Sequence, residues 1–348
     1  MIRASGQLAA GRLNTSLLAR GRFTKGRLTA GFLAAGLLAI LGSGSVQAAR
    51  AQEPIDLDVI AKIKAEGLER SEVLVMYTLL TAAIGPRLAG SPAFKRAADW
   101  AVGRLDGWGL DDVHLEAWEF GRGWTLEGFT LEMTTPRYFP LTGFPEAWTP
   151  STKGEVNSKP VYVGDKTLEE LNALRPDLTG SVVLTTPPQY EFITEDRLQP
   201  ADFQERVPTG APGSSRTRSL VNSRELAPLL QEAGAAVTLR PNNGQHGTIF
   251  VLGNRNTPDD AVPSIVMASE HYNMTHSMEE AGEDVQLRVA IESRYHEKDT
   301  NGYNVLAQIP GTDPDVADEI VLIGGHLDSW HSSPGGSDNA DGVASTME

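Results

Sequence analysis

One stretch of the sequence, Ile320–Trp330, constrains the fold more than any other. It reads Ile-Val-Leu-Ile-Gly-Gly-His-Leu-Asp-Ser-Trp. Four apolar residues in a row are typical of a central parallel strand that is buried on both faces, so we expect a strand over 319–323. His326 follows where that strand would end, and in open α/β sheets ligands gather at the carboxyl ends of strands. The stretch therefore predicts an α/β fold with a functional site at the edge of its sheet.

Three side chains in this region have the chemistry of a metal site. Residues two apart in an extended chain point to the same side, so His326 and Asp328 share a face. A carboxylate beside a ligating imidazole can fix its orientation and raise its basicity. Asp338 lies in a loop after Gly335 and Gly336, and can reach the same edge. Histidine and carboxylates without a thiolate favour a catalytic zinc site, and a bridging carboxylate would let two zinc ions polarise one carbonyl.

The rest of the chain alternates between helical and strand patterns, which predicts a mixed sheet with flanking helices. Helices are expected over 57–82, 93–108, 223–233 and from 342 onward. Strands are expected over 113–120, 125–133, 160–163, 181–184, 247–251, 264–267, 285–291 and 304–309. A polar stretch, 187–218, is expected to be a long surface loop. We divide the chain into 1–51, 52–150, 151–295 and 296–348, with one boundary in a segment rich in Pro, Thr, Ser and Gly.

The first 51 residues differ from the rest. They hold seven Lys and Arg residues and no Asp or Glu, and a basic stretch precedes an apolar run, Leu28–Leu41. Small residues follow up to Ala51, and this order is typical of a secretory signal peptide cleaved after Ala48 or Ala51. The alternative is an uncleaved membrane anchor, but the run of 14 residues is shorter than the ~20 that a spanning helix needs. We expect a secreted or periplasmic protein with no stable membrane insertion after cleavage.

Charge and cysteine content exclude several classes of function. Removal of residues 1–51 takes away seven positive charges and moves the net charge from −15 to −22. Such an acidic protein is not expected to bind nucleic acid or an anionic membrane. The sequence contains no cysteine, which excludes disulfides, thiol catalysis and thiolate metal sites, and for an exported protein favours a bacterial periplasm or exterior. No Gly-x-Ser-x-Gly elbow is present, so a serine hydrolase is not expected.

The sequence resembles a known family, the two-zinc exopeptidases, which include bacterial aminopeptidases and plasma glutamate carboxypeptidase (carboxypeptidase Q). The resemblance runs from about Asp56 to Glu348. Three stretches carry it, namely Ile84–Ser91, Asn304–Gly311, and the pair GGHLDSW and SDNADG. The spacing of the last pair is the most specific of the three.

The resemblance implies a role for each candidate residue. His326 would be a zinc ligand, and Asp338 would bridge the two zinc ions of a complete site. Asp328 would orient His326 and is the candidate catalytic residue. The Asp338–Asn339 peptide is expected to be cis. The implied activity is hydrolysis of terminal residues from peptides or dipeptides, as an aminopeptidase or a carboxypeptidase, with a homodimer among the arrangements that the resemblance allows.

The resemblance also marks what the chain lacks. In the family, the general-base Glu, its neighbouring Glu ligand, a further acidic ligand and a second His ligand lie downstream of the bridging Asp, whereas this sequence stops ten residues after Asp338. We therefore expect a C-terminally truncated, inactive fragment that binds zinc weakly. Residues 154–293 resemble the protease-associated domain inserted in many members, which would act as a substrate-access or interaction lid. The alternative is a non-catalytic exported ectodomain of the same fold that binds a partner.

The other histidines are not expected to bind metal. His331 is expected to lie on the rim of the site and contact substrate. The Glu279-Glu280 pair is expected to lie on a solvated face. The remaining histidines lack a carboxylate or second histidine at ligand spacing, so we expect surface or hydrogen-bonded positions for His114, His246, His271, His276 and His296.

Overall fold

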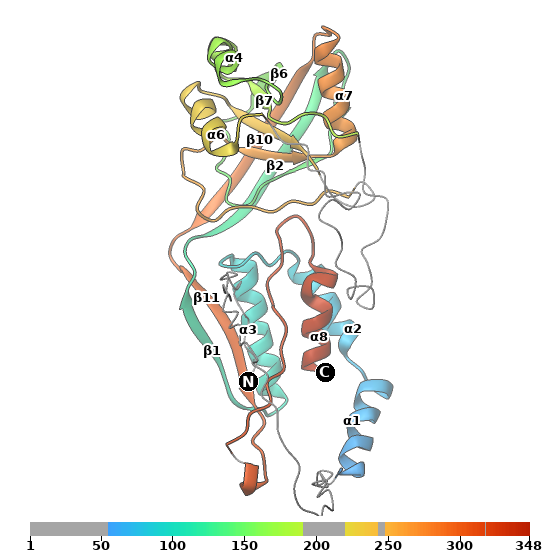
Figure 1. The fold of residues 1–348 in the computed structure, drawn as a ribbon. Coiled ribbons are helices and arrows are strands. Elements are labelled where there is room, and N and C mark those ends of the chain that lie inside the picture. Colours follow the sequence, from blue (N-terminus) through green and yellow to red (C-terminus); the bar gives the residue numbers. More distant parts are fainter. Residues whose placement is uncertain (1–54, 191–219, 243–247, 317) are drawn as a thin grey trace, which may run out of the picture. The chain divides into compact units, whose positions relative to one another are not determined.

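The computed structural model describes residues 55–190, 220–242, 248–316 and 318–348 (Figure 1). The expected signal peptide and His246 lie outside the described residues, as does 191–218 of the expected long loop. The described residues fall into two compact units, one with 55–71 and the other with 72–348. In the part of the chain that is described, no helix is long and apolar enough to cross a bilayer.

The first unit contains a single helix. Helix α1 (Leu57–Glu69) begins at Asp56, whose carboxylate accepts the N–H groups of Asp58 and Val59 at 3.0 Å. None of its residues is buried. The expected helix over 57–82 is therefore wrong in its length, because helical structure stops at Arg70. The break includes Ser71, a residue whose side chain competes for backbone hydrogen bonds and weakens helix interiors.

In the second unit, one helical layer covers a pair of strands. The chain resumes as α2 (Val73–Thr78) and continues as the π-helical turn η1 (Leu79–Ile84). Helix α3 (Pro92–Gly107) begins at Ser91, whose Oγ accepts the N–H of Phe94 at 3.2 Å. It packs on β1 (Asp111–Glu119) and β11 (Asn301–Gln308), which pair antiparallel. The expected helix over 93–108 and the strands over 113–120 and 304–309 are confirmed.

The C-terminal helix joins this layer. The π-helical turn η4 (Gly336–Ala340) leads into α8 (Asp341–Met347), which packs on α2 (Figure 1). The core that α3, η1, η4 and α8 share consists of Leu80, Phe94, Ala97, Ala98, Leu327, Ala340 and Val343. The loop before α8 is thereby packed against the same core as the helices.

Two long strands continue from the pair β1–β11. Strands β2 (Gly123–Thr135) and β10 (Gln286–His296) pair antiparallel, with the short β3 (Phe139–Pro140) and β5 (Val156–Ser158) at their edges. The segments that link β1 to β2 and β10 to β11 also contact each other, because the N–H groups of Phe120 and Gly121 donate to the carbonyl of Thr300 at 3.0 and 2.9 Å. The chain therefore runs from β1 into β2 and returns from β10 into β11 with the two segments side by side (Figure 1). We call these two successive pairs the double strand.

A five-stranded sheet lies between β2 and β10 in the sequence. Its order is β4 (Gly143–Pro145), β9 (Ser264–Met267), β8 (Val237–Pro241), β7 (Val182–Leu184) and β6 (Pro160–Tyr162). Strands β6 to β9 are parallel and β4 is antiparallel. The helices of this region are α4 (Leu168–Ala173), α5 (Arg175–Leu178), α6 (Ser223–Glu232) and α7 (Ser269–Glu280).

Alternation along the strands divides the core of this sheet. Val182 and Leu184 pack with side chains from β2 and β10, whereas Val183 packs with α4, α5 and α6. Two apolar layers therefore bury both faces, as parallel strands require. The region is an α/β layer: α6 confirms the expected helix over 223–233, whereas α4, α5 and α7 were not expected. Its likeness to a protease-associated domain stays a prediction.

Two expected strands are wrong. Residues 319–323 form no strand, and the side chains of Ile320 to Ile323 are 52% to 86% exposed. An apolar run becomes a central strand only when neighbouring strands accept its hydrogen bonds, and no described strand pairs with this one. Residues 248–251 are irregular as well, and only Gly253 forms an isolated bridge, to Ala147.

Candidate metal centre

A close backbone approach positions the loop that carries His326. A Cβ atom on Gly325 would lie 3.1 Å from Asn339 Nδ2 and 3.2 Å from the backbone nitrogen of Val343. A methyl group there would require these neighbours to shift by a few tenths of an ångström, so glycine suits the close approach to the beginning of α8. The contact holds the loop of His326 beside η4, which carries Asp338.

The structure brings the three candidate residues together. His326 Nδ1 lies 3.1 Å from Asp328 Oδ1 and 3.1 Å from the carbonyl oxygen of Asp328. On the other side of the ring, His326 Nε2 lies 2.8 Å from Asp338 Oδ1. The side chains are 41%, 45% and 72% exposed for His326, Asp328 and Asp338, so a ligand can reach all three from solvent. The Asp338–Asn339 peptide is cis, as expected.

The contact between His326 and Asp338 has the character of a cation site. An imidazole that donates from Nδ1 presents a lone pair at Nε2. The Oδ1 of Asp338 also presents lone pairs, so two acceptors face each other at 2.8 Å. Such a pair is stable only with a proton or a metal ion between the two atoms. Tetrahedral zinc keeps two ligand atoms roughly 3.4 Å apart, so a displacement of about half an ångström would admit it.

The donor set in the described residues is incomplete. Zinc in proteins takes three or four protein ligands, and the sequence predicts two of them, His326 and Asp338. Within 55–190, 220–242, 248–316 and 318–348, no group of three or more His, Asp or Glu side chains is arranged to hold a metal ion. Glu348 does not add to the donors, because its carboxylate accepts the N–H of Glu72 at 3.2 and 3.3 Å.

Two residues that sequence reasoning assigned no role support the loop. The N–H of Ser329 donates to the carbonyl of Arg87 at 3.0 Å, and the N–H of Arg87 donates to Ser329 Oγ at 3.0 Å. Ser329 is buried and Arg87 is fully buried. The only sequence signal was their position, since Arg87 lies within Ile84–Ser91 and Ser329 within GGHLDSW, two of the stretches that carry the family resemblance.

His331 has a different place from the one expected. Instead of standing free on a rim, its Nε2 lies 2.7 Å from the carbonyl oxygen of Pro145. Its ring packs edge-on against Trp124 at 5.1 Å and beside Phe144 at 5.5 Å. Burial lowers the pKa of His331, and the Pro145 carbonyl opposes that shift. The ring is therefore a neutral anchor between the site loop and the start of the five-stranded sheet.

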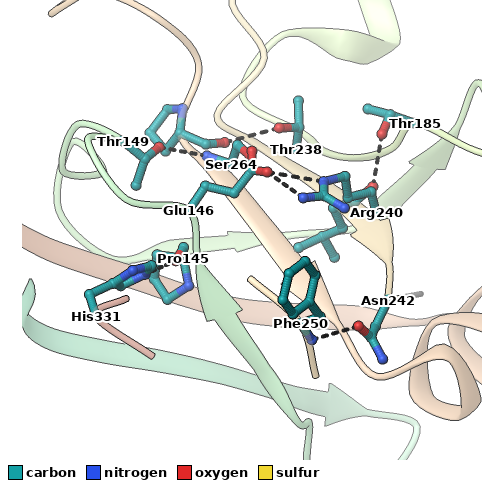
Figure 2. A network of polar contacts seen from close by, with 12 residues as sticks. Pro145, Glu146, Thr149, Thr185, Thr238, Arg240, Asn242, Phe250, Ser264 and His331 are labelled. Carbon is teal, nitrogen blue, oxygen red and sulfur yellow. Dashed lines mark hydrogen bonds and ion pairs between the residues drawn. The ribbon is translucent and has the colours of Figure 1, made fainter. Parts of the chain in front are cut away.

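Figure 2 shows how that anchor continues into the sheet. Glu146, next to Pro145, accepts hydrogen bonds from the guanidinium of Arg240 on β8 and from the hydroxyl of Ser264 on β9. The N–H of Ser264 donates to Thr149 Oγ1 at 2.8 Å. A chain of polar contacts thus ties the loop after His326 to strands far away in the sequence.

The remaining histidines lie away from the site. Three of the described ones make hydrogen bonds, as expected: His114 with Asp112, His271 with the N–H of Thr142, and His296 with Thr125. His276 differs from the expectation, because it is buried edge-on to Tyr162 and its Nδ1 has no hydrogen-bond partner. Of the pair expected on a solvated face, Glu280 is exposed, whereas Glu279 is half-buried, and this burial raises the pKa of Glu279.

Comparison with known proteins gives matches to a peptidase family and to curated relatives. Residues 304–348 match peptidase family M28. Carboxypeptidase Q of Bos taurus is 24% identical over 298 residues, which cover 86% of this chain and 56% of the relative. Carboxypeptidase Q of Homo sapiens is 23% identical over 303 residues, with 86% and 56% covered. The chain therefore spans little more than half the length of the curated relatives it matches.

A solved structure supports the fold. The peptidase M28 precursor from Shewanella amazonensis superposes with a TM-score of 0.55 and 24% sequence identity, over 83% of this chain and 61% of that one. The expected α/β fold with sheets and flanking helices is confirmed. Together, these matches show that the chain is similar to peptidases of family M28 and to carboxypeptidase Q, and that it shares the fold of the M28 peptidase precursor.

Proposed function

We propose that this chain carries part of the active site of an exported zinc-dependent exopeptidase that releases terminal residues from peptides or dipeptides. The observation that carries the proposal is the alignment of Asp328, His326 and Asp338 in one line of contacts. His326 and Asp338 are the proposed zinc ligands, with Asp338 as the bridge between two ions. Bound zinc would supply a Lewis acid and a nucleophilic water.

The protein groups have separate tasks in this proposal. Asp328 accepts a hydrogen bond from Nδ1–H of His326 and thereby keeps the lone pair of Nε2 directed at the metal position. Asp338 supplies negative charge, which favours binding of a cation and disfavours its loss. His326 and Asp328 are half-exposed and Asp338 is exposed, which leaves room for a peptide carbonyl to approach.

We further propose that the chain by itself hydrolyses nothing. A catalytic zinc site needs three protein ligands and a base for the water, and the described residues bring only two ligands together. Zinc affinity of the chain alone is therefore expected to be weak.

Zinc titration by calorimetry tests the proposal. The unaltered chain should bind zinc, and His326→Ala or Asp338→Ala should abolish binding. His114→Ala is the matched control, because that histidine is exposed and lies outside the site. Equal binding by the unaltered chain and His326→Ala would contradict the assigned ligands. Absence of any zinc binding by the unaltered chain would favour the alternative, a non-catalytic exported binding ectodomain of the same fold. Measurable hydrolysis of dipeptides by the chain would contradict its proposed inactivity.

A further inference from the structure

Arg87 is a buried cation whose role the proposed function does not explain. Its side chain is fully buried, in the turn between η1 and α3. A buried guanidinium is costly unless each of its N–H groups finds a partner. None of the ion pairs among the described residues includes Arg87, so no carboxylate compensates its charge by direct contact. Its partners must be found among neutral groups.

Main-chain carbonyl oxygens fill that need. The Nε–H donates to Leu327 O at 2.9 Å, and Nη1 donates to Leu80 O at 2.8 Å, Gly85 O at 3.0 Å and Pro334 O at 3.0 Å. Nη2 donates to Gly335 O at 3.1 Å. The planar fork of guanidinium donors can hold several acceptors in fixed directions, which the ammonium of lysine cannot do.

The acceptors belong to the two segments that carry the metal site. Leu327 lies between His326 and Asp328, and Pro334 and Gly335 lie four and three residues before Asp338. One guanidinium therefore ties the loop of the histidine to the loop of the bridging carboxylate. The two remaining acceptors, on η1 and just after it, fix both loops to the helical layer.

The two loops touch at the point where Arg87 bridges them. Gly335 has φ +64°, and a Cβ there would lie 2.2 Å from the Cβ of Ser329. Ser329 is itself joined to the main chain of Arg87 by two hydrogen bonds. Burial lowers the pKa of Arg87, and the charge of Asp328 opposes that shift. The cation is thus electrostatically linked to the carboxylate that orients His326.

We propose that Arg87 is the positioning residue of the metal centre, which sets the separation of His326 and Asp338 by holding the carbonyl groups of both loops. This inference rests on the proposed function, since the centre it positions is the proposed zinc site. Arg87 touches no reacting group and acts only through the two loops.

The test compares Arg87→Lys with a matched control, Val183→Ala. Lysine keeps the charge but loses the fork, and Val183 is fully buried in the five-stranded sheet, away from the site. We measure unfolding by urea, zinc affinity by competition with a chelator, and the visible spectrum of the Co²⁺-loaded chain. Arg87→Lys should weaken zinc binding roughly tenfold or more, the range seen when groups that orient metal ligands are removed, and should alter the Co²⁺ spectrum. Val183→Ala should lower the free energy of unfolding and leave the zinc affinity and the Co²⁺ spectrum unchanged.

A metal-free measurement separates this inference from the proposed function. The ring resonances of His326, assigned by their loss in His326→Ala, should shift in Arg87→Lys without metal, while those of His114 stay in place. If the unaltered chain binds no zinc, the proposed function fails and this shift still tests the positioning role. A folded Arg87→Lys chain with unchanged His326 resonances, or with unaltered zinc affinity where the parent binds zinc, would overturn the inference. If Arg87→Lys does not fold, Ser329→Ala is measured instead. This variant removes the hydroxyl that accepts the main-chain N–H of Arg87, and the same outcomes apply to it.

Discussion

Asp328→Asn tests the orienting role of the carboxylate with a change of one atom. The side chain keeps its size, but the group that faces His326 Nδ1 at 3.1 Å loses its negative charge. Removal of such a partner costs about 10- to 100-fold in metal affinity. Two features place the expected loss of affinity in Asp328→Asn at the lower end of this range. The carbonyl oxygen of Asp328 also lies 3.1 Å from Nδ1 and remains, and the carboxylate is 45% exposed, so water screens its charge. We expect about a tenfold loss, or about 1.4 kcal/mol.

The assay is zinc affinity by chelator competition at fixed ionic strength. Asp341→Asn is the matched control, because it removes the same charge from an exposed position three residues beyond Asp338. The carboxylate of Asp341 accepts the N–H of its neighbour Gly342 at 2.7 Å. It should lower affinity by less than about twofold, since exposed charges at such distances are screened. Equal losses in the two variants would show that Asp328 acts through general charge alone. An unchanged affinity in Asp328→Asn would refute the orienting role.

Three further predictions concern stability. Because the pKa of His331 is lowered in the folded chain, the unfolded chain takes up this proton first as pH falls through the ordinary value of 6.5, so the free energy of unfolding should be highest above that pH and decline below it. In His331→Gln, the free energy of unfolding by urea should vary less between about pH 7.5 and 5.5. An unchanged pH dependence would contradict the burial argument. Gly335→Ala should cost about 1 to 3 kcal/mol of unfolding free energy, and more than Gly154→Ala, which has the same left-handed backbone but nothing within 4 Å of the added methyl. Val321→Lys should change the unfolding free energy by less than about 0.5 kcal/mol, because that side chain is 86% exposed; a larger loss would mean that it packs as a buried strand.

Local pattern was sufficient for the elements whose apolar side chains repeat clearly. Helix α3 has its serine cap and a row of buried apolar residues, and β10 alternates along its length, so both were predictable. Helix α7 was missed because Tyr272, Thr275 and His276 are among its buried residues, and polar side chains do not mark a core face in a sequence. The segment 319–323 was predicted wrongly because pairing partners, not its own residues, decide whether such a run becomes a strand.

Some residues of the candidate site were likewise predictable from the sequence, and others were not. Spacing and glycine positions were enough to predict that His326, Asp328 and Asp338 would meet, because residues two apart share a side and glycines permit close approach. Arg87 and Ser329 were not predictable as supports. Their partners are carbonyl and amide groups of the main chain, which every residue possesses and which therefore leave no trace in the sequence.

The double strand formed by β1–β11 and β2–β10 has a consequence for protein engineering. Glu119 lies opposite Asn301, so the cuts needed to excise everything between them would leave two neighbouring ends. A two-residue Asn-Gly turn is the usual closure for such an antiparallel pair. A miniature chain with 120–300 replaced by that turn would keep β1, β11 and α3 in their native connectivity, at the cost of the packing that His331 makes with Pro145. Domains inserted through adjacent ends are those most easily exchanged between proteins. Residues 120–300 can therefore be removed or replaced without changing the order of the elements in the rest of the chain.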